Sequence, residues 1–293
     1  MEFFHKVPHI HFLGARKPAM IMSVVVLIAA IASLAVHGLN FGVDFTGGVT
    51  VQVAYPGSVD LKDVRSALAA GGFENAIAQN YGTPQEVLIR LQVKGQSEKD
   101  AGDKVLTALQ KSQPQVKLEQ VNFVGPEVGK DLATKGALAF AVTLFGILIY
   151  IVLRFEWRLA LGAVAATLHD VVFVVGFFSL LHIEFDLNVL ASVLAVMGYS
   201  VNDTVVVFDR IREDFRKMRK GTPIEIMNTA INETLSRTIM TSGVTLLVVV
   251  ALLLLGGPVL HGFSLALFVG IVVGTYSSIY IASATALMLG VSK

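Results

Sequence analysis

Long apolar runs separated by short polar segments cover most of this chain. A membrane-spanning helix needs about 20 mostly apolar residues, with roughly 17–25 tolerated. A run at residues 159–181 meets this length only if His169 and Asp170 are accepted inside it. The other runs that qualify are residues 19–36, 136–153, 187–208, 239–255 and 263–289. The pattern predicts an α-helical polytopic membrane protein with six transmembrane helices.

Between the first two predicted spans, the pattern changes to that of a small soluble α+β domain. Residues 61–70 have helical spacing, with Asp60 as the N-cap and Gly71-Gly72 as the stop signal. Ser97 is the expected N-cap of a second helix, at residues 97–111. Strands are predicted at residues 49–54, 76–81, 86–93 and 116–123, with a hairpin between the middle two. The order βαββαβ is that of a ferredoxin-like domain.

These patterns predict three parts of the chain. Residues 1–38 form the N-terminus and the first transmembrane helix, residues 39–134 the external α+β domain, and residues 135–293 the other five helices. The last part includes a cytoplasmic loop at residues 209–236, whose second half has the pattern of an amphipathic helix. This segment could transmit motion between two spans, or it could be a plain surface connector.

The orientation follows from Lys and Arg in the short loops. The basic residues that precede the first span or lie in the loops after the second and fourth spans are Lys6, Arg16, Lys17, Arg154, Arg158, Arg210, Arg212, Arg216, Lys217, Arg219 and Lys220. The opposite short loops, residues 182–188 and 256–262, lack Lys and Arg. Both termini are therefore expected in the cytoplasm. The first span is favoured as an uncleaved signal-anchor over a cleavable signal peptide, because its apolar run continues to Val36.

Composition narrows the class of function. The chain is 54% hydrophobic and only 15% charged, which excludes an ordinary soluble domain. It has no cysteine, so disulfides and thiolate metal sites are excluded, and its net charge of +1 argues against nucleic-acid binding. No Ser/His/Asp set or metal-ligand cluster lines up at one membrane depth. We therefore expect no enzyme activity, no cofactor and no metal.

The most unusual polar position is Asp203, which lies inside a predicted span with Asn202 beside it. A carboxylate at the centre of a span costs about 2.5–3.5 kcal/mol on insertion scales. Because a chain does not normally accept that cost for stability, an intramembrane acid is typical of a proton relay or an ion site. The alternative is an acid that stabilises helix packing and is satisfied by neighbouring side chains.

Arg237 opens the fifth predicted span and enters from the side at which the fourth span ends. Asp203 lies roughly 9 Å from that side, at 1.5 Å of rise per residue, so the two could share one depth. A nearby arginine makes a membrane carboxylate tolerable and its proton affinity adjustable. The four-residue spacing of Arg237, Thr241 and Thr245 favours an inward-facing Arg237 paired with Asp203. The alternative is an interfacial anchor.

Small residues recur at four-residue spacing in several spans, which lets helix backbones approach closely. Gly162 shares a helix face with Asp170, and Gly198 shares one with Asn202. We therefore expect Asp170 and Asn202 to point at protein rather than lipid, with Asp170 either structural or a relay acid. His169 is adjacent to Asp170, so the two side chains are expected to project in different directions.

Two glycine-bearing segments flank the external domain. The first contains Asp44, Gly47 and Gly48, and the second, at residues 124–130, contains Gly125 and Gly129. The second segment lacks the spacing of a phosphate-binding loop. Spacing alone favours tight turns, with Asp44 bonding its own backbone, over a functional hinge.

Four segments, taken in order, resemble the SecF-type subunits of the bacterial SecD/SecF protein-export family. They are residues 41–48 (FGVDFTGG), 124–126 (VGP), 201–213 (VNDTVVVFDRIRE) and 235–242 (LSRTIMTS). The resemblance covers nearly the whole chain. It implies the RND-type superfamily, in which two six-helix halves pair in pseudo-symmetry, with SecD as the other half.

The resemblance also implies a function in the bacterial inner membrane. With SecD, such proteins use the proton gradient to help exported polypeptides leave the SecYEG channel on the periplasmic side, after the ATPase SecA has pushed them through. Asp203 and Arg237, with Asn202 beside them, match the charges linked to proton flow. Asp44, Gly47 and Gly48 match an external signature. The implied partners are SecD, SecYEG, exported polypeptides and membrane lipid.

Two other functions remain open on the sequence. A proton-coupled RND-type exporter of small molecules would share the intramembrane acid, but an external domain of this size leaves little room for a drug pocket. A passive scaffold of the translocon would use Asp203 and Arg237 only as packing groups.

Overall fold

The computed structural model describes residues 8–74, 76–91, 98–218 and 220–291. The chain divides into two compact units. One is a helical bundle made of Met1–Asn40, Ala139–Gly256 and Gly262–Lys293, and the other is an α+β domain made of Phe41–Leu138 and Gly257–His261. Lys6, Val93, Ser97 and Arg219, on which some predictions rest, lie outside the described residues.

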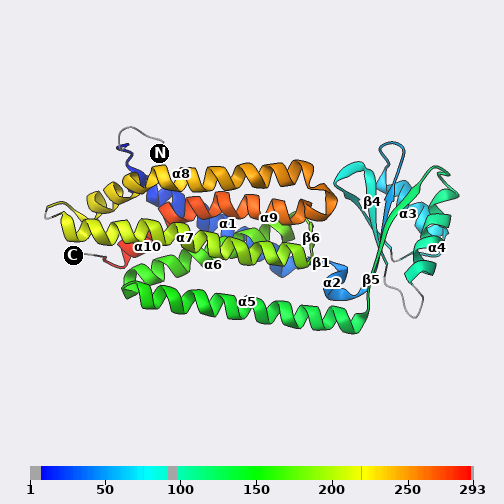
Figure 1. Ribbon diagram of the computed structural model, residues 1–293, viewed down its shortest axis with the longest axis horizontal. Helices are drawn as coiled ribbons and strands as arrows, with labels where there is room; N and C mark the ends of the chain where they lie inside the picture. Colours follow the sequence, from blue (N-terminus) through cyan, green and yellow to red (C-terminus); the bar gives the residue numbers. More distant parts are fainter. Residues whose placement is uncertain (1–7, 75, 92–97, 219, 292–293) are drawn as a thin grey trace. The chain divides into compact units, whose positions relative to one another are not determined.

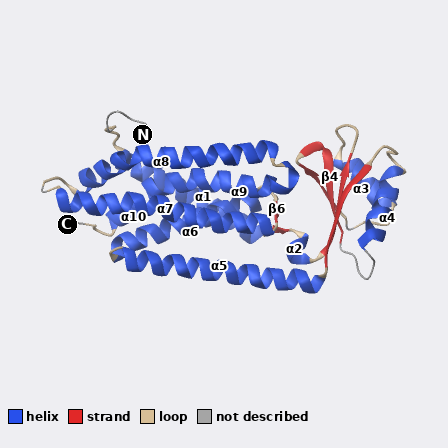
Figure 2. Cartoon of the chain, in the orientation of Figure 1, coloured by secondary structure: helices blue, strands red, loops and turns tan. Residues whose placement is uncertain are grey.

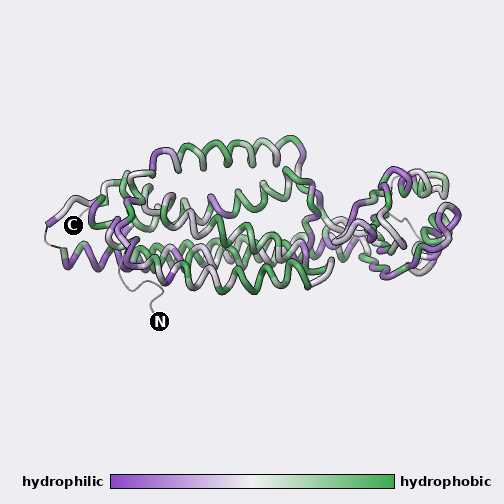
Figure 3. Tube along the Cα trace, turned by 90° about the horizontal axis from the view of Figure 1, so that it is seen from above, coloured by the Kyte–Doolittle hydropathy of each residue, from purple (hydrophilic) through white to green (hydrophobic). Residues whose placement is uncertain are grey.

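Long helices account for nearly all of the bundle (Figure 1). In chain order the helical elements are η1 (Phe12–Ala15), α1 (Arg16–Val36), α5 (Pro126–Arg154), α6 (Trp157–Leu180), α7 (Leu187–Lys217), α8 (Pro223–Leu255), α9 (Gly257–Ser277), the π-helical turn η2 (Ser278–Ala282) and α10 (Ser283–Met288). Within the described residues, six helical segments are long and apolar enough to cross a membrane. Hydrophobic residues fill the middle of these helices, and hydrophilic residues gather toward their ends (Figure 3). The predicted spans are confirmed.

The interior of the bundle centres on α6 and α7, whose buried side chains include Phe178, Met197 and Phe208. Glycines allow the helices to approach closely. A Cβ atom at Gly176 would lie 2.3 Å from the Cβ of Ala30 on α1. By contrast, α5 lies along an edge of the bundle and exposes a row of large apolar side chains (Figure 1).

The segment predicted as a loop at residues 209–236 is mostly helix. α7 continues to Lys217, and α8 already begins at Pro223 behind a capping box formed by Thr222 and Glu225. The amphipathic pattern is confirmed, because Met227, Ala230 and Ile231 are buried in the bundle core and Ile226 is buried as well.

The N-terminal segment is fastened to this same part of α8. The side-chain amide of Asn232 accepts a hydrogen bond from Ile10 N at 2.9 Å and donates one to Ile10 O at 2.8 Å. Asn228 Oδ1 accepts from Leu13 N at 3.2 Å, and the Leu13 side chain is fully buried. The start of the chain and the start of α8 therefore form one packed end of the bundle.

The α+β domain has the predicted βαββαβ order (Figure 2). Its elements are β2 (Gly48–Ala54), α3 (Leu61–Ala70), β3 (Ile77–Tyr81), β4 (Thr83–Leu91), α4 (Glu98–Gln110) and β5 (Lys117–Val124). The sheet order is β3-β4-β2-β5, with antiparallel neighbours throughout, as in a ferredoxin-like domain. Asp60 caps α3 as predicted, since its side chain accepts a hydrogen bond from Lys62 N.

One face of this sheet forms the core of the domain. Val49, Val51 and Val53 of the central strand β2 are fully buried, together with Leu68 of α3 and Leu109 of α4. Alternate residues along a strand point to the same face, so the valine pattern of β2 accounts for this core directly. Three short elements complete the described chain. They are α2 (Val43–Thr46) and the strands β1 (Asn40–Phe41) and β6 (Glu184–Phe185), which form a two-stranded sheet.

The close packing of α9 on α7 can be tested at Gly270. A Cβ there would lie 2.1 Å from Cγ2 of Val196, whereas a Cβ at Gly146 on α5 meets nothing within 4 Å. Gly270→Ala should destabilise the protein by about 1–3 kcal/mol through overpacking. Gly146→Ala should be neutral or stabilising because alanine is the better helix former. Thermal unfolding of the purified protein in detergent measures both, and equal midpoints would contradict the packing described.

Candidate functional site

Asp203 lies inside the bundle on α7, with 4% of its surface exposed. Its Oδ1 accepts a hydrogen bond from Thr238 Oγ1 of α8 at 2.9 Å, and its Oδ2 accepts one from Ser278 Oγ of η2 at 2.6 Å. The ion pairs found among the described residues do not include Asp203. Neutral hydroxyl groups, rather than a cation, therefore hold this acid between three helical elements.

Arg237 was expected to face the interior of the bundle, and within this single chain that expectation is wrong. Arg237 and Thr241 are exposed on the surface of α8, and Thr241 donates a hydrogen bond to the Arg237 carbonyl at 3.0 Å. The reason is helical geometry: Thr238 faces Asp203, and consecutive residues of an α-helix point about 100° apart. The direct Asp203–Arg237 pair that the spacing favoured is therefore not formed.

Asn202 is also exposed, next to the buried Asp203. The helix face it shares with Gly198 is open in this chain, since a Cβ at Gly198 would meet nothing within 4 Å. No described part of this chain covers Asn202, so the expectation that it points at protein rather than lipid stays a prediction that concerns a partner chain. The spacing of small residues correctly predicted close helix packing at Gly162, where a Cβ would lie 2.6 Å from the Ala282 carbonyl oxygen.

Asp170 on α6 is a second buried acid and has no exposed surface. Its Oδ2 accepts hydrogen bonds from Ser200 Oγ at 2.5 Å and Ser277 Oγ at 2.6 Å. Its Oδ1 lies 2.8 Å from His169 Nδ1, so the two side chains meet, contrary to the expectation that they project apart. The prediction that Asp170 faces protein is confirmed.

His169 is itself buried, and its Nε2 has no hydrogen-bond partner among the described residues. Its ring lies near the rings of Phe173 and Tyr276, with centroids 6.2 and 6.4 Å away. Within the described parts of the chain, no group of three or more His, Asp or Glu residues could hold a metal ion. The chemistry that this arrangement offers is the binding of protons by two carboxylates among hydroxyl groups.

Sequence reasoning did not assign a role to the hydroxyl partners of the acids. Thr238 lies within the motif at residues 235–242, and no sequence pattern distinguishes Ser200, Ser277 or Ser278 from the other serines of the spans. Serine and threonine are common in membrane helices, so their presence alone gives no signal. Their partners depend on the rotation of each helix, which an apolar run does not specify.

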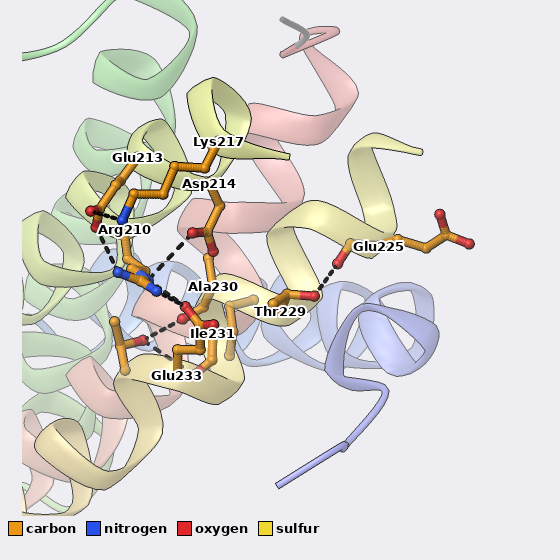
Figure 4. A network of polar contacts seen from close by, with 10 residues as sticks. Arg210, Glu213, Asp214, Lys217, Glu225, Thr229, Ala230, Ile231 and Glu233 are labelled. Atoms are coloured by element: carbon orange, nitrogen blue, oxygen red, sulfur yellow. Dashed lines mark hydrogen bonds and ion pairs between the residues drawn. The ribbon is translucent and has the colours of Figure 1, made fainter. Parts of the chain in front are cut away.

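The bundle end at which α7 and α8 meet carries a network of ion pairs (Figure 4). Arg210 of α7 bonds Glu233 of α8 and also pairs with Glu213 and Asp214 of its own helix. Lys217 Nζ lies 2.5 Å from Glu213 Oε1. Several charges that share partners constrain geometry better than an isolated surface pair. This network joins the end of α7 to the first turns of α8.

The two glycine-bearing segments pack against each other within the α+β domain unit. Gly47 has a φ of 69° and Gly48 a φ of 135°, both in the region that favours glycine. A Cβ at Gly47 would lie 2.8 Å from Pro126 Cα, and one at Gly129 would lie 2.8 Å from Gly47 N. We call Gly47, Gly48, Pro126 and Gly129 the glycine junction. Asp44 is half-buried in the first turn of α2 beside it.

Two carboxylates lie on the sheet of the α+β domain. Burial, and secondly the negative charge of Glu119, raise the pKa of Glu86 above its ordinary value. Glu119 accepts a hydrogen bond from Gln52 on the central strand at 3.0 Å. No His or nucleophile joins these groups in the contacts given for the described residues, so they form a polar sheet surface and not a catalytic set.

Six apolar helices among the described residues, with buried acids between them and an inserted α+β domain, define a multi-pass membrane protein. The family model described as "Protein export membrane protein SecD/SecF, C-terminal" matches residues 104–292. A second model, described as "SecD/SecF GG Motif", matches residues 32–55, which include Gly47 and Gly48. The chain therefore belongs to the SecD/SecF family of protein-export membrane proteins, and within it to the SecF translocase subunits.

Individual relatives agree with this assignment. The chain is 49% identical to the protein translocase subunit SecF of Vibrio alginolyticus over 286 residues, which cover 97% of this chain and 91% of the relative. It is 46% identical to that of Escherichia coli O157:H7 over 275 residues, covering 93% and 85%. The crystal structure of SecDF, a translocon-associated membrane protein from Thermus, matches with a TM-score of 0.87 and 37% identity. That match covers 96% of this chain and 39% of the larger SecDF chain. The protein is thus a transport subunit and not an enzyme.

The glycine junction can be tested at Gly48, where a Cβ would lie 2.6 Å from the Leu91 carbonyl oxygen and the φ disfavours other residues. Gly48→Ala should destabilise the α+β domain by about 1–3 kcal/mol through this strained backbone. Gly57→Ala is the control, since a Cβ there meets nothing within 4 Å. Limited proteolysis of the full-length protein should show faster cleavage within residues 41–138 only for Gly48→Ala. Unchanged cleavage of that variant would mean that the junction tolerates a side chain.

Proposed function

We propose that this chain, paired with SecD, uses the proton gradient to promote late translocation and release of polypeptides on the periplasmic side of SecYEG. The observation that carries the proposal is the burial of Asp203 in a candidate membrane span without a paired cation. An ionisable group in that setting is expensive, and exchange of a proton is the function that such groups usually serve.

The same proposal assigns an orientation. Arg154, Arg158, Arg212 and Lys217 lie at the bundle end where α5 meets α6 and where α7 leads into α8. By the positive-inside rule this end is cytoplasmic. The N-terminal segment is bound to α8 at this end, through Asn232. The α+β domain lies between α1 and α5 in the chain, so it belongs on the periplasmic side of the inner membrane.

Protonation of Asp203 would change the contacts among three helical elements. As a carboxylate, Asp203 accepts hydrogen bonds from both Thr238 and Ser278. A neutral carboxyl group has an O–H that needs an acceptor, and the hydroxyl oxygens of Thr238 and Ser278 are already in contact with it, so donation to one of them reverses that hydrogen bond. Since Thr238 is on α8 and Ser278 is on η2, the change acts on the packing of both against α7.

The energy available suits a small conformational change. One charge that crosses 100 mV releases about 2.3 kcal/mol. Hydrogen bonds to a charged group contribute about 1.5–3 kcal/mol each, so one proton is enough to exchange such a contact. A larger step needs several protons. In this proposal the glycine junction, with Asp44 beside it, carries the motion to the α+β domain, because Gly47 and Gly129 are in backbone contact there.

The exposed polar residues of α7 and α8 indicate that a partner protein covers them within the membrane. A guanidinium that faces lipid costs several kcal/mol, yet Arg237 is exposed in this chain, with Asn202 exposed on the neighbouring helix. The solved SecDF chain is larger than this one, and we infer that SecD covers these positions. In that arrangement Arg237 acts on proton coupling from the interface between the two halves rather than by direct contact with Asp203.

The first test is translocation of a secreted protein into membrane vesicles that contain the assembled SecD complex, with ATP and an imposed proton gradient. Asp203→Asn keeps the size of the side chain but removes its ionisation, so the gradient-dependent part of translocation should disappear while the ATP-driven part remains. Asp131→Asn, at an exposed acid of α5, should behave as wild type. Full stimulation by the gradient in Asp203→Asn, with assembly intact, would favour a passive scaffold.

The second test concerns the partner surface. A photo-crosslinking amino acid at position 241, one turn from Arg237, should capture SecD because this face of α8 meets protein. Position 153 on α5 is the control, since Leu153 is 83% exposed among other apolar side chains and is expected to face lipid. Analysis by mass spectrometry identifies the captured molecule. Capture of lipid alone at position 241 would show that the exposed stripe is not the contact with SecD.

A further inference from the structure

Two consecutive serines hydrogen-bond two different buried acids. Ser277 Oγ donates to Asp170 Oδ2 and Ser278 Oγ donates to Asp203 Oδ2, both at 2.6 Å. Neither serine has any exposed surface. Since Asp170 is on α6 and Asp203 is on α7, a single step along the chain connects the two acids.

The serines lie at a break in helix type. Ser277 is the last residue of α9, and Ser278 is the first residue of the π-helical turn η2. Such turns are rare in proteins overall, but those that occur are often found at functional sites. The turn also contacts α6 directly, because the Ala282 carbonyl oxygen leaves no space for a side chain at Gly162. A movement of η2 therefore acts on the helix that carries Asp170.

Each serine has a second acceptor within reach. Ser277 Oγ lies 3.1 Å from the Gly274 carbonyl oxygen, and Ser278 Oγ lies 3.0 Å from that of Thr275. A hydroxyl group has one proton, so it can donate fully to only one acceptor. When the acid is a carboxylate, the serine donates to it. When the acid is neutral, its O–H donates to the serine oxygen, and the serine proton turns to the carbonyl. Both protonation states are thus satisfied without a buried unpaired group.

We propose that Ser277 and Ser278 are positioning residues that couple the protonation of Asp170 to that of Asp203 through η2. The proposal rests on the proposed function and deepens it, because it makes the proton site a pair of acids. A proton on either acid reverses the hydrogen bond to one serine. Because the two serines are consecutive in one helical segment, a shift of the first displaces the second and changes its hydrogen bond to the other acid.

The surroundings of the two acids differ. Asp170 also contacts Ser200 and His169, while Asp203 also contacts Thr238. Titratable and charged groups on the packed elements near the two acids in the chain or in their contacts include His169 of α6, Tyr199 of α7, Arg237 of α8 on its exposed side, Tyr276 of α9 and Tyr280 of η2. The same helices carry further charged residues, among them the ion-pair network around Arg210. Tyr276 donates to the Ala19 carbonyl of α1 at 2.7 Å rather than to either acid. The two serines are consecutive residues of one continuous helical segment, Val259–Met288, and each contacts one of the two acids.

The experiment uses the complete SecD complex in vesicles, with gradient-driven translocation measured over a pH series. Ser278→Ala and Ser277→Ala should each reduce the gradient-dependent part roughly tenfold and displace the midpoint of its pH profile, because one hydrogen bond to a charged group is lost. Ser264→Ala is the matched control, since Ser264 is a buried serine of α9 whose hydroxyl has no partner among the described residues. Ser→Cys variants at 277 and 278 keep the volume but donate only weakly, and they replace any alanine variant that fails to assemble.

Infrared difference spectra between acidic and neutral pH give a second readout that does not depend on export. A carboxyl C=O band that is absent in Asp203→Asn should shift in Ser278→Ala, and in Ser277→Ala through the coupling, but not in Ser264→Ala. If the band is present and unmoved in both serine variants and their pH profiles match wild type, the serine proposal is overturned while the proposed function stands. If Asp203→Asn retains both the gradient effect and the band, the proposed function itself fails, and the serine proposal with it.

Discussion

The burial of the Asp203 carboxylate among hydroxyl groups is the constraint on which the arrangement of the bundle depends. A buried acid without hydrogen-bond donors would cost several kcal/mol, so Thr238 and Ser278 must remain within about 3 Å of it. That requirement sets the rotation of α8 and the position of η2 relative to α7. The close approach of α9 to α7 at Gly270 is compatible with it, since a larger residue there would collide with Val196. Packing and polar contacts therefore specify the same geometry.

The elements of the fold could be predicted from the sequence because each has a strong local signal. Apolar length predicted the six spans, and the alternation of Val49, Val51 and Val53 predicted the central strand. The Asp60 cap gave the start of α3. What failed was the rotation of helices about their own axes. Four-residue spacing put Arg237 and Thr241 on one face, which is correct, but did not say that Thr238 occupies the face toward α7.

The candidate site was predictable only in part for the same reason. An acid in an apolar run is visible in the sequence, so Asp203 and Asp170 could be selected. Their partners come from residues far away in the chain, Ser278 and Ser277, and from a π-helical turn that has no sequence signature. The contact of His169 with Asp170 was not predicted. Consecutive residues of a helix point in different directions at Cβ, but this does not prevent the ends of their side chains from forming a hydrogen bond.

The contrast between the two acids bears on how a proton could be turned into movement. Asp170 contacts three polar groups and is completely enclosed, so its surroundings stabilise one arrangement. Among the described residues Asp203 has two hydroxyl partners, which belong to α8 and η2. Asp170 also joins different elements, because Ser200 is on α7 and Ser277 ends α9, so a change of charge at either acid acts on the packing of the helices around it. Arg210 and Glu233 join α7 and α8 at one end of the bundle, so a displacement near Asp203 would be taken up on the side of Asp203 that lies away from this ionic network.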